Sequence, residues 1–86
     1  MADLRISRAT AAKISREHGI TEDQVRMNVV CVAGLTFTWH HHPERGRRAI
    51  IRTRIENRTV LVVLYPRPDD AYGDSWNLGS AYPIAG

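Results

Sequence analysis

The sequence predicts an α+β domain in which two N-terminal helices pack on a four-stranded, mainly antiparallel sheet. Apolar residues recur at helical spacing up to Gly34 and alternate with polar residues after it, which marks a change from helices to strands. The alternating or apolar segments are then joined mostly by short turns, as in an antiparallel meander. A chain of 86 residues buries one thin core, so we expect a single domain over residues 1–86.

The first helix is predicted over roughly residues 8–18. Ser7 is a typical N-cap residue, because its hydroxyl can accept a hydrogen bond from the first turn. Gly19 is typical of the position after a helix C-terminus, where the backbone turns left-handed. Both ends of this helix are therefore predicted from residues at the ends themselves.

The second helix is predicted to begin with a capping box formed by Thr21 and Gln24. Its apolar positions repeat at helical spacing, and Gly34 is expected to end it. Those apolar positions are Val25, Val29 and Val32.

The first two strands are predicted on either side of a turn at residues 43–46. Apolar and polar residues alternate over residues 35–40 and again over Arg47–Ile55. Because successive side chains of a strand point to opposite faces, the second strand has one face of Ala49, Ile51, Thr53 and Ile55. Its other face carries Arg48, Ile50, Arg52 and Arg54.

The last two strands are predicted over residues 59–65 and 75–82. The first of them is apolar on both faces, which is typical of a central strand. A turn at residues 56–58 precedes it, and a loop at residues 66–74 follows it. In the final strand, one face is expected to carry Trp76, Leu78, Ser80 and Tyr82.

The positive charge is concentrated in one part of the chain. The formal net charge is +3, yet residues 45–58 hold six arginines and a single acid, Glu56. Arginines on one strand face repeat at about 7 Å per two residues, comparable to the phosphate spacing of a nucleic-acid backbone. Such a surface is typical of proteins that bind phosphate, nucleic acid or an acidic partner.

The size and composition of the chain exclude several classes of protein. A chain this short cannot form a nucleotide-cofactor fold, an α/β barrel or a multidomain enzyme. Its one cysteine, Cys31, cannot form an internal disulfide, which fits a reducing compartment. The N-terminus lacks the apolar stretch of a secretion signal, and the longest apolar run, at residues 60–65, is too short to span a bilayer. We therefore expect a cytoplasmic protein without a membrane partner.

Two segments carry a resemblance to a known family. Residues 16–25 read REHGITEDQV, and residues 76–84 read WNLGSAYPI. With the arginine-rich hairpin and apolar strand between them, they resemble the small toxins of bacterial toxin–antitoxin systems in the RelE, ParE and BrnT group. The resemblance implies helices packed behind a compact sheet and, in many members, cleavage of RNA.

The same resemblance implies partners. They are a cognate antitoxin, in a toxin–antitoxin hetero-oligomer, and RNA, either messenger or ribosome-associated. ParE-like relatives act on DNA gyrase, so a non-catalytic toxin with a protein target remains an alternative, as does a small nucleic-acid-binding domain. Family members commonly have Arg or His near the final strand, whereas this chain has Trp76, Asn77, Ser80 and Tyr82 there.

A metal-independent ribonuclease needs a base, an acid and positive charge near the phosphate. Histidine exchanges protons near neutral pH, and three histidines precede the arginine-rich strand. The predicted catalytic residues are His40, His41, His42, Arg52, Arg54 and Tyr82. The predicted nucleic-acid-binding residues are Arg45, Arg47, Arg48, Arg58 and Arg67. The alternative for the histidines is a hydrated run at a strand end.

The histidine run also suggests a metal site, because imidazole binds zinc, copper and nickel. Two histidines at alternate strand positions could bind one ion, but such sites usually need three or four ligands. Cys31 lies among valines, so it is a poor ligand or nucleophile. We therefore predict no metal and no cofactor.

Overall fold

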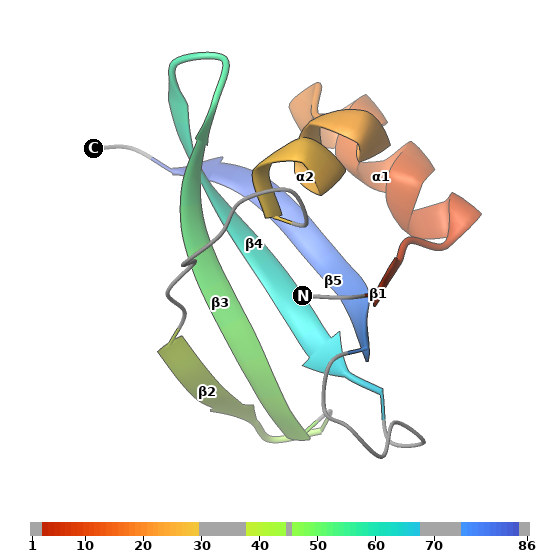
Figure 1. Ribbon diagram of the computed structural model, residues 1–86, viewed down its shortest axis with the longest axis vertical. Coiled ribbons are helices and arrows are strands. Elements are labelled where there is room, and N and C mark those ends of the chain that lie inside the picture. Colours follow the sequence, from red (N-terminus) through yellow and green to blue (C-terminus); the bar gives the residue numbers. More distant parts are fainter. Residues whose placement is uncertain (1–2, 30–37, 45, 68–74, 85–86) are drawn as a thin grey trace.

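A computed structural model describes residues 3–29, 38–44, 46–67 and 75–84. Two helices pack on one face of a five-stranded sheet (Figure 1). The elements in chain order are β1 (Asp3–Arg5), α1 (Arg8–His18), α2 (Glu22–Val29), β2 (Thr38–His42), β3 (Gly46–Ile55), β4 (Arg58–Pro66) and β5 (Ser75–Ile84). The predicted α+β class and the two N-terminal helices are confirmed.

The sheet has the strand order β1-β5-β4-β3-β2, so β4 is central as predicted. Three neighbouring pairs are antiparallel, but β1 pairs with β5 in parallel. The prediction of four strands is therefore wrong, because β1 is a fifth strand. Its three residues are too few for a periodic pattern, and the strand exists through its pairing of Leu4 with Trp76 and Arg5 with Asn77.

Both helix starts form as predicted. The backbone N–H of Thr10 donates to Ser7 Oγ at 3.1 Å, and Gly19 has a left-handed φ of 66° at the end of α1. At α2, the N–H of Thr21 donates to Gln24 Oε1 at 2.9 Å and the N–H of Gln24 donates to Thr21 Oγ1 at 3.1 Å.

Some predicted features lie outside the described residues. They are Val32 and Gly34 of the second helix, the start of the first strand at residues 35–37, and most of the loop at 66–74.

The core lies between the helices and one face of the sheet. The helices and their junction contribute Ile14, Ile20, Val25 and Val29. The strands contribute Leu4, Ala49, Ile51, Ile55, Val60, Val62, Leu64, Trp76, Leu78 and Ala81. Burial of these apolar side chains is the main favourable term in folding. The helix-covered face of the sheet therefore stabilises the fold. No helix in the described ranges is long and apolar enough to cross a membrane.

An irregularity changes the phase of β5. Leu64 of β4 pairs with Leu78, but Val63 pairs with Ser80, so Gly79 is an extra residue in β5. The predicted shared face of Trp76, Leu78, Ser80 and Tyr82 is therefore wrong. The first two side chains are buried in the core, whereas Ser80 pairs with a residue of the opposite face.

The hairpin between β3 and β4 fixes which residues face the core. Glu56 and Asn57 both have positive φ, 50° and 65°, as in a two-residue turn of type I′. The pairing of Ile55 with Arg58 follows directly from this turn. A slip of one residue would move the arginines of β3 to the helix-covered face, so the turn decides their exposure.

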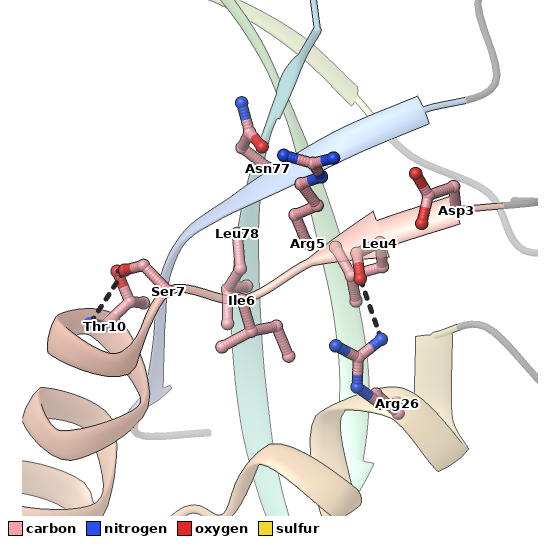
Figure 2. Close-up of a pocket in the computed structure, with 9 residues that line it drawn as sticks. All are labelled: Asp3, Leu4, Arg5, Ile6, Ser7, Thr10, Arg26, Asn77 and Leu78. Carbon is pink, nitrogen blue, oxygen red and sulfur yellow. Dashed lines mark hydrogen bonds between the residues drawn. The ribbon is translucent and has the colours of Figure 1, made fainter.

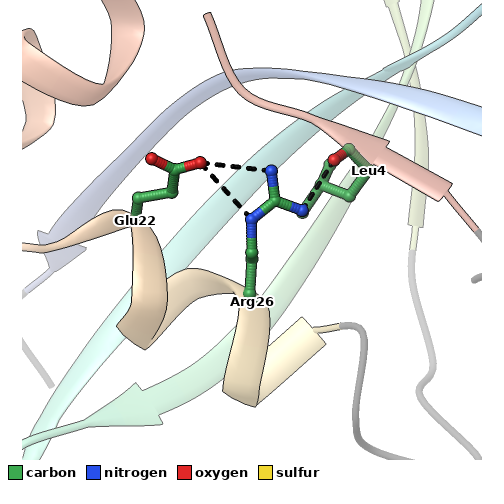
Figure 3. A network of polar contacts seen from close by, with 3 residues as sticks. All are labelled: Leu4, Glu22 and Arg26. Atoms are coloured by element: carbon green, nitrogen blue, oxygen red, sulfur yellow. Dashed lines mark hydrogen bonds and ion pairs between the residues drawn. The ribbon is translucent and has the colours of Figure 1, made fainter. Parts of the chain in front are cut away.

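A polar network joins α2 to β1 (Figure 3). Arg26 Nη1 donates to the carbonyl oxygen of Leu4 at 2.8 Å, while Nε and Nη2 donate to Glu22 Oε1 at 3.4 and 3.2 Å. The short strand β1 is thus held by α2 as well as by β5.

Candidate functional site

The sheet face opposite the helices carries the arginines of β3. We call this surface the arginine face and define it from the strand register. Its described residues are Asp3, Arg5, Thr38, His40, His42, Gly46, Arg48, Ile50, Arg52, Arg54, Thr59, Leu61, Val63, Tyr65, Ser75, Asn77, Ser80, Tyr82 and Ile84. The predicted common face of Arg48, Arg52 and Arg54 is confirmed, because their β3 neighbours Ala49, Ile51 and Ile55 are all buried in the core.

The three arginines differ in their surroundings. Arg52 is exposed, and Arg54 is exposed with Nη2 donating to the carbonyl oxygen of Asn57 at 3.2 Å. Arg48 is half-buried, and its Nε is buried without any hydrogen-bond partner in the described part of the chain. An unsatisfied buried donor costs about 1–3 kcal/mol, so an acceptor oxygen beside Arg48 would relieve an existing penalty.

Other predicted binding arginines have partners within the protein. The guanidinium carbon of Arg47 lies 4.2 Å from the ring centroid of Trp39, on the helix side of the sheet. Arg58 Nη1 donates to the carbonyl oxygen of His18 at 3.0 Å, where a cation also interacts favourably with the end of α1. Arg67 forms an ion pair with Asp3 at 3.5 Å. Arg45 lies outside the described residues.

The strand register separates the three histidines. His40 pairs with Arg48 and His42 with Gly46, which places both on the arginine face, while His41 pairs with Arg47 on the other face. The N–H of Glu44 donates to His42 Nδ1 at 3.1 Å, so His42 also forms part of the turn. Directly paired side chains in an antiparallel sheet have β-carbons about 5 Å apart. His40 is therefore the histidine that stands opposite an arginine of this face.

The structure does not bring the predicted catalytic set together. Arg52 is four residues beyond Arg48, or about 13 Å along β3 at the usual rise per residue. Tyr82 pairs with Leu61 of β4, which in turn pairs with Arg52, and its ring centroid lies 6.4 Å from that of His18. Arg52, Arg54 and Tyr82 therefore lie toward one end of the sheet, whereas the histidines lie at the other.

The two tryptophans pack on the helix side of the sheet. Their rings are stacked with centroids 5.6 Å apart, and Arg47 also contacts the ring of Trp39. Trp76 is buried, whereas Trp39 is 41% exposed. The pair extends the core toward β2 and is not part of the arginine face.

In the described part of the chain, two pockets lie near the arginine face. The larger, about 740 Å³, is between β1 and the start of α1 (Figure 2) and includes Arg5, Arg26 and Asn77 in its lining. Arg26 already binds Glu22 and Leu4, which leaves it a structural role there. The smaller, about 430 Å³, is lined by Arg52, Thr53, Arg54 and Thr59. Neither lining contains a histidine.

No three His, Cys, Asp or Glu residues among those described lie close enough together to hold a metal ion. Cys31 lies outside the described ranges.

Two residues of the arginine face were missed by the sequence interpretation. Arg5 and Asn77 pair with each other across β1 and β5, and Figure 2 shows their side chains next to each other, on the side of the strands away from Arg26. The available signal was the alternation of Leu4 and Ile6 with Asp3 and Arg5, which is too short to indicate a strand alone.

Comparison of the chain with protein-family models, curated proteins and solved structures gives no significant match. Function therefore has to be inferred from the site itself.

Proposed function

We propose that this protein is the toxin of a bacterial toxin–antitoxin system and acts in the cytoplasm as a metal-independent endoribonuclease. The proposal rests on one observation: Arg48, Arg52 and Arg54 share the sheet face that the helices leave uncovered. Asp3 lies on this face by the register of β1, and its carboxylate is paired with Arg67. The face is therefore positively charged, as a surface that binds RNA must be. The resemblance to the RelE, ParE and BrnT group supports the same activity.

Arginine suits this role because its planar guanidinium can bind a phosphate group with two hydrogen bonds. Each phosphate contact releases counterions from the nucleic acid, so binding weakens as salt increases. We expect the affinity for RNA to fall steeply between low and physiological salt, with a contribution from each arginine of the face.

The proposed chemistry is centred on His40 and Arg48. His40 accepts the proton of a 2′-hydroxyl, the 2′ oxygen attacks phosphorus, and the 5′ oxygen leaves with a proton from solvent. Arg48 stabilises the negative charge that builds up on the phosphate oxygens in the transition state. The products are a 2′,3′-cyclic phosphate and a free 5′-hydroxyl.

The antitoxin is the proposed partner protein. A positively charged sheet face is complementary to an acidic segment, and covering it would block access of RNA. Toxin and antitoxin would then form an inactive hetero-oligomer.

Cleavage is tested with purified protein, RNA and EDTA. We expect fragments ending in 2′,3′-cyclic phosphate, and a loss of at least 100-fold in rate for His40→Ala, since general acid–base catalysis contributes about 10²–10⁴-fold. His41→Ala is the matched control, because the neighbouring histidine lies on the opposite face. Intact RNA at high protein concentration would refute the enzymatic activity, and equal rates for both variants would refute the role of His40.

Toxin behaviour is tested by induced expression with and without the neighbouring gene. We expect growth arrest that the neighbour relieves and that Arg52→Ala weakens while the protein stays folded. Growth that is unaffected by expression would refute the toxin assignment. Arrest with DNA damage and intact RNA would instead indicate a protein target such as gyrase.

A further inference from the structure

A row of five side chains crosses the arginine face near the ends of the strands. His40 pairs with Arg48, and Tyr65 and Arg5 each pair with Asn77. The pairing of Ala49 with Leu64, carried one residue further, sets Arg48 beside Tyr65. The row therefore contains two arginines with an aromatic ring and an amide between them.

Gly79 makes room for the aromatic ring in this row. A β-carbon on Gly79 would lie 2.3 Å from Tyr65 Cε2 and 2.8 Å from Cδ2, closer than real contacts allow. The edge of the Tyr65 ring thus occupies the space that a side chain at residue 79 would fill. Because the ring is half-buried and held in this way, it is positioned before any ligand binds, which lowers the entropy cost of binding.

The polar groups on either side suit a nucleotide. The Nε of Arg48 is buried without a hydrogen-bond partner among the described residues, and Arg5 and Asn77 are exposed next to each other (Figure 2). The α-carbons of the two arginines are three strand spacings apart, or about 14 Å, which two long side chains can bridge toward one nucleotide. The amide of Asn77 can both donate and accept hydrogen bonds at a base edge.

We propose that Arg48, Tyr65, Asn77 and Arg5 form a subsite for one unpaired nucleotide of single-stranded RNA. The base stacks on Tyr65, Asn77 hydrogen-bonds to the base edge, and the flanking phosphates bind Arg48 and Arg5. This inference rests on the proposed function and adds two properties to it. The RNA is single-stranded, because the bases of a duplex are already stacked and paired, and its chain crosses β4 and β5 at this point.

The first experiment uses the unmodified protein and needs no mutant to fold. Binding is measured with 2′-O-methyl RNA, which lacks the nucleophile, as a single strand, as the matched duplex, and as single strands with one abasic position each. We expect the single strand to bind at least tenfold more tightly than the duplex, and one abasic position to weaken binding by roughly tenfold. Equal affinity for single strand and duplex, or no effect of any abasic position, would overturn the subsite.

The second experiment compares variants for binding of the single strand. Tyr65→Leu should lose roughly tenfold in affinity, and Tyr65→Phe, which keeps the ring that stacks on the base, should recover most of that loss. Asn77→Ala should weaken binding and alter base preference. Arg16→Gln, an exposed position on α1, is the control for loss of one positive charge. Thermal unfolding of each variant verifies that it is folded.

The two proposals fail in different ways. Strong binding of single-stranded RNA that is indifferent to Tyr65→Leu and Asn77→Ala would overturn the subsite and leave the arginine face as an RNA-binding surface. A protein that binds none of these RNAs would overturn both proposals.

Discussion

The two faces of the same sheet differ in what holds their side chains in place. On β3, Ile51 is 2% exposed and belongs to the core beneath the helices, whereas its neighbour Ile50 is half-buried among the residues of the arginine face. One face is stabilised by apolar burial, and the other combines apolar positions with charged ones. A face that contributes less to stability can carry binding groups, so the five-stranded sheet offers one face for stability and the other for the proposed binding of RNA.

The largest expected effect comes from truncating the two neighbouring isoleucines. Ile51→Ala should lower the free energy of unfolding by about 3 kcal/mol, because it leaves a cavity under the helices. Ile50→Ala should cost less than half of that, since its side chain is still partly in contact with solvent. Urea denaturation with an unchanged m-value measures both. Equal losses would mean that the two faces are packed alike.

The next effect concerns the close packing of Gly79 against Tyr65 on the arginine face. Gly79→Ala should lower the free energy of unfolding by about 2 kcal/mol, because the added methyl group overlaps the Tyr65 ring. In a Tyr65→Leu background the same change should cost less than half as much, since the longer ring is gone. A double-mutant cycle measures this coupling. Additive losses would show that Gly79 is required for another reason.

The arginines should differ in their effects on RNA binding. Arg48→Met should weaken binding about tenfold without loss of stability, because it removes an unsatisfied buried donor and keeps the aliphatic stem. Arg52→Met should have a smaller effect, and Arg54→Met the smallest, because Arg54 already binds the carbonyl oxygen of Asn57. Fluorescence anisotropy at two salt concentrations, with thermal unfolding of each variant, tests this order. A destabilised Arg48→Met would instead make Arg48 a structural residue.

The sequence was sufficient to predict a structural feature wherever that feature depends on residues close together in the chain. Ser7, Gly19, Thr21 and Gln24 mark helix ends correctly because their hydrogen bonds and backbone angles are local. The alternation along β3 likewise assigns its arginines to one face. The strand β1 and the extra residue Gly79 were missed because both depend on distant partners, β5 for the first and β4 for the second.

The candidate site was predictable only in part for the same reason. Charge patterning indicated an arginine surface, but it could not show that Arg47, Arg58 and Arg67 contact Trp39, His18 and Asp3. Nor could it show how far apart the ends of a ten-residue strand place His40 and Arg52. His40 and Arg48 belong to one candidate site because β2 and β3 pair them, and not because they are close in sequence.

The smallest expected effect tests whether the turn that orients the arginine face contributes to binding. Asn57→Gly should raise the free energy of unfolding by about 0.5 kcal/mol, because glycine adopts the φ of 65° without strain. Asn57→Val should lower it, because a β-branched residue is strained there. RNA affinity should be the same for Asn57→Gly, since Arg54 binds only the backbone carbonyl of residue 57 and the strand register is unchanged. Urea denaturation and anisotropy on the same preparations measure both quantities. An altered affinity would show that the turn itself contacts RNA, and the binding surface would then extend beyond the arginine face.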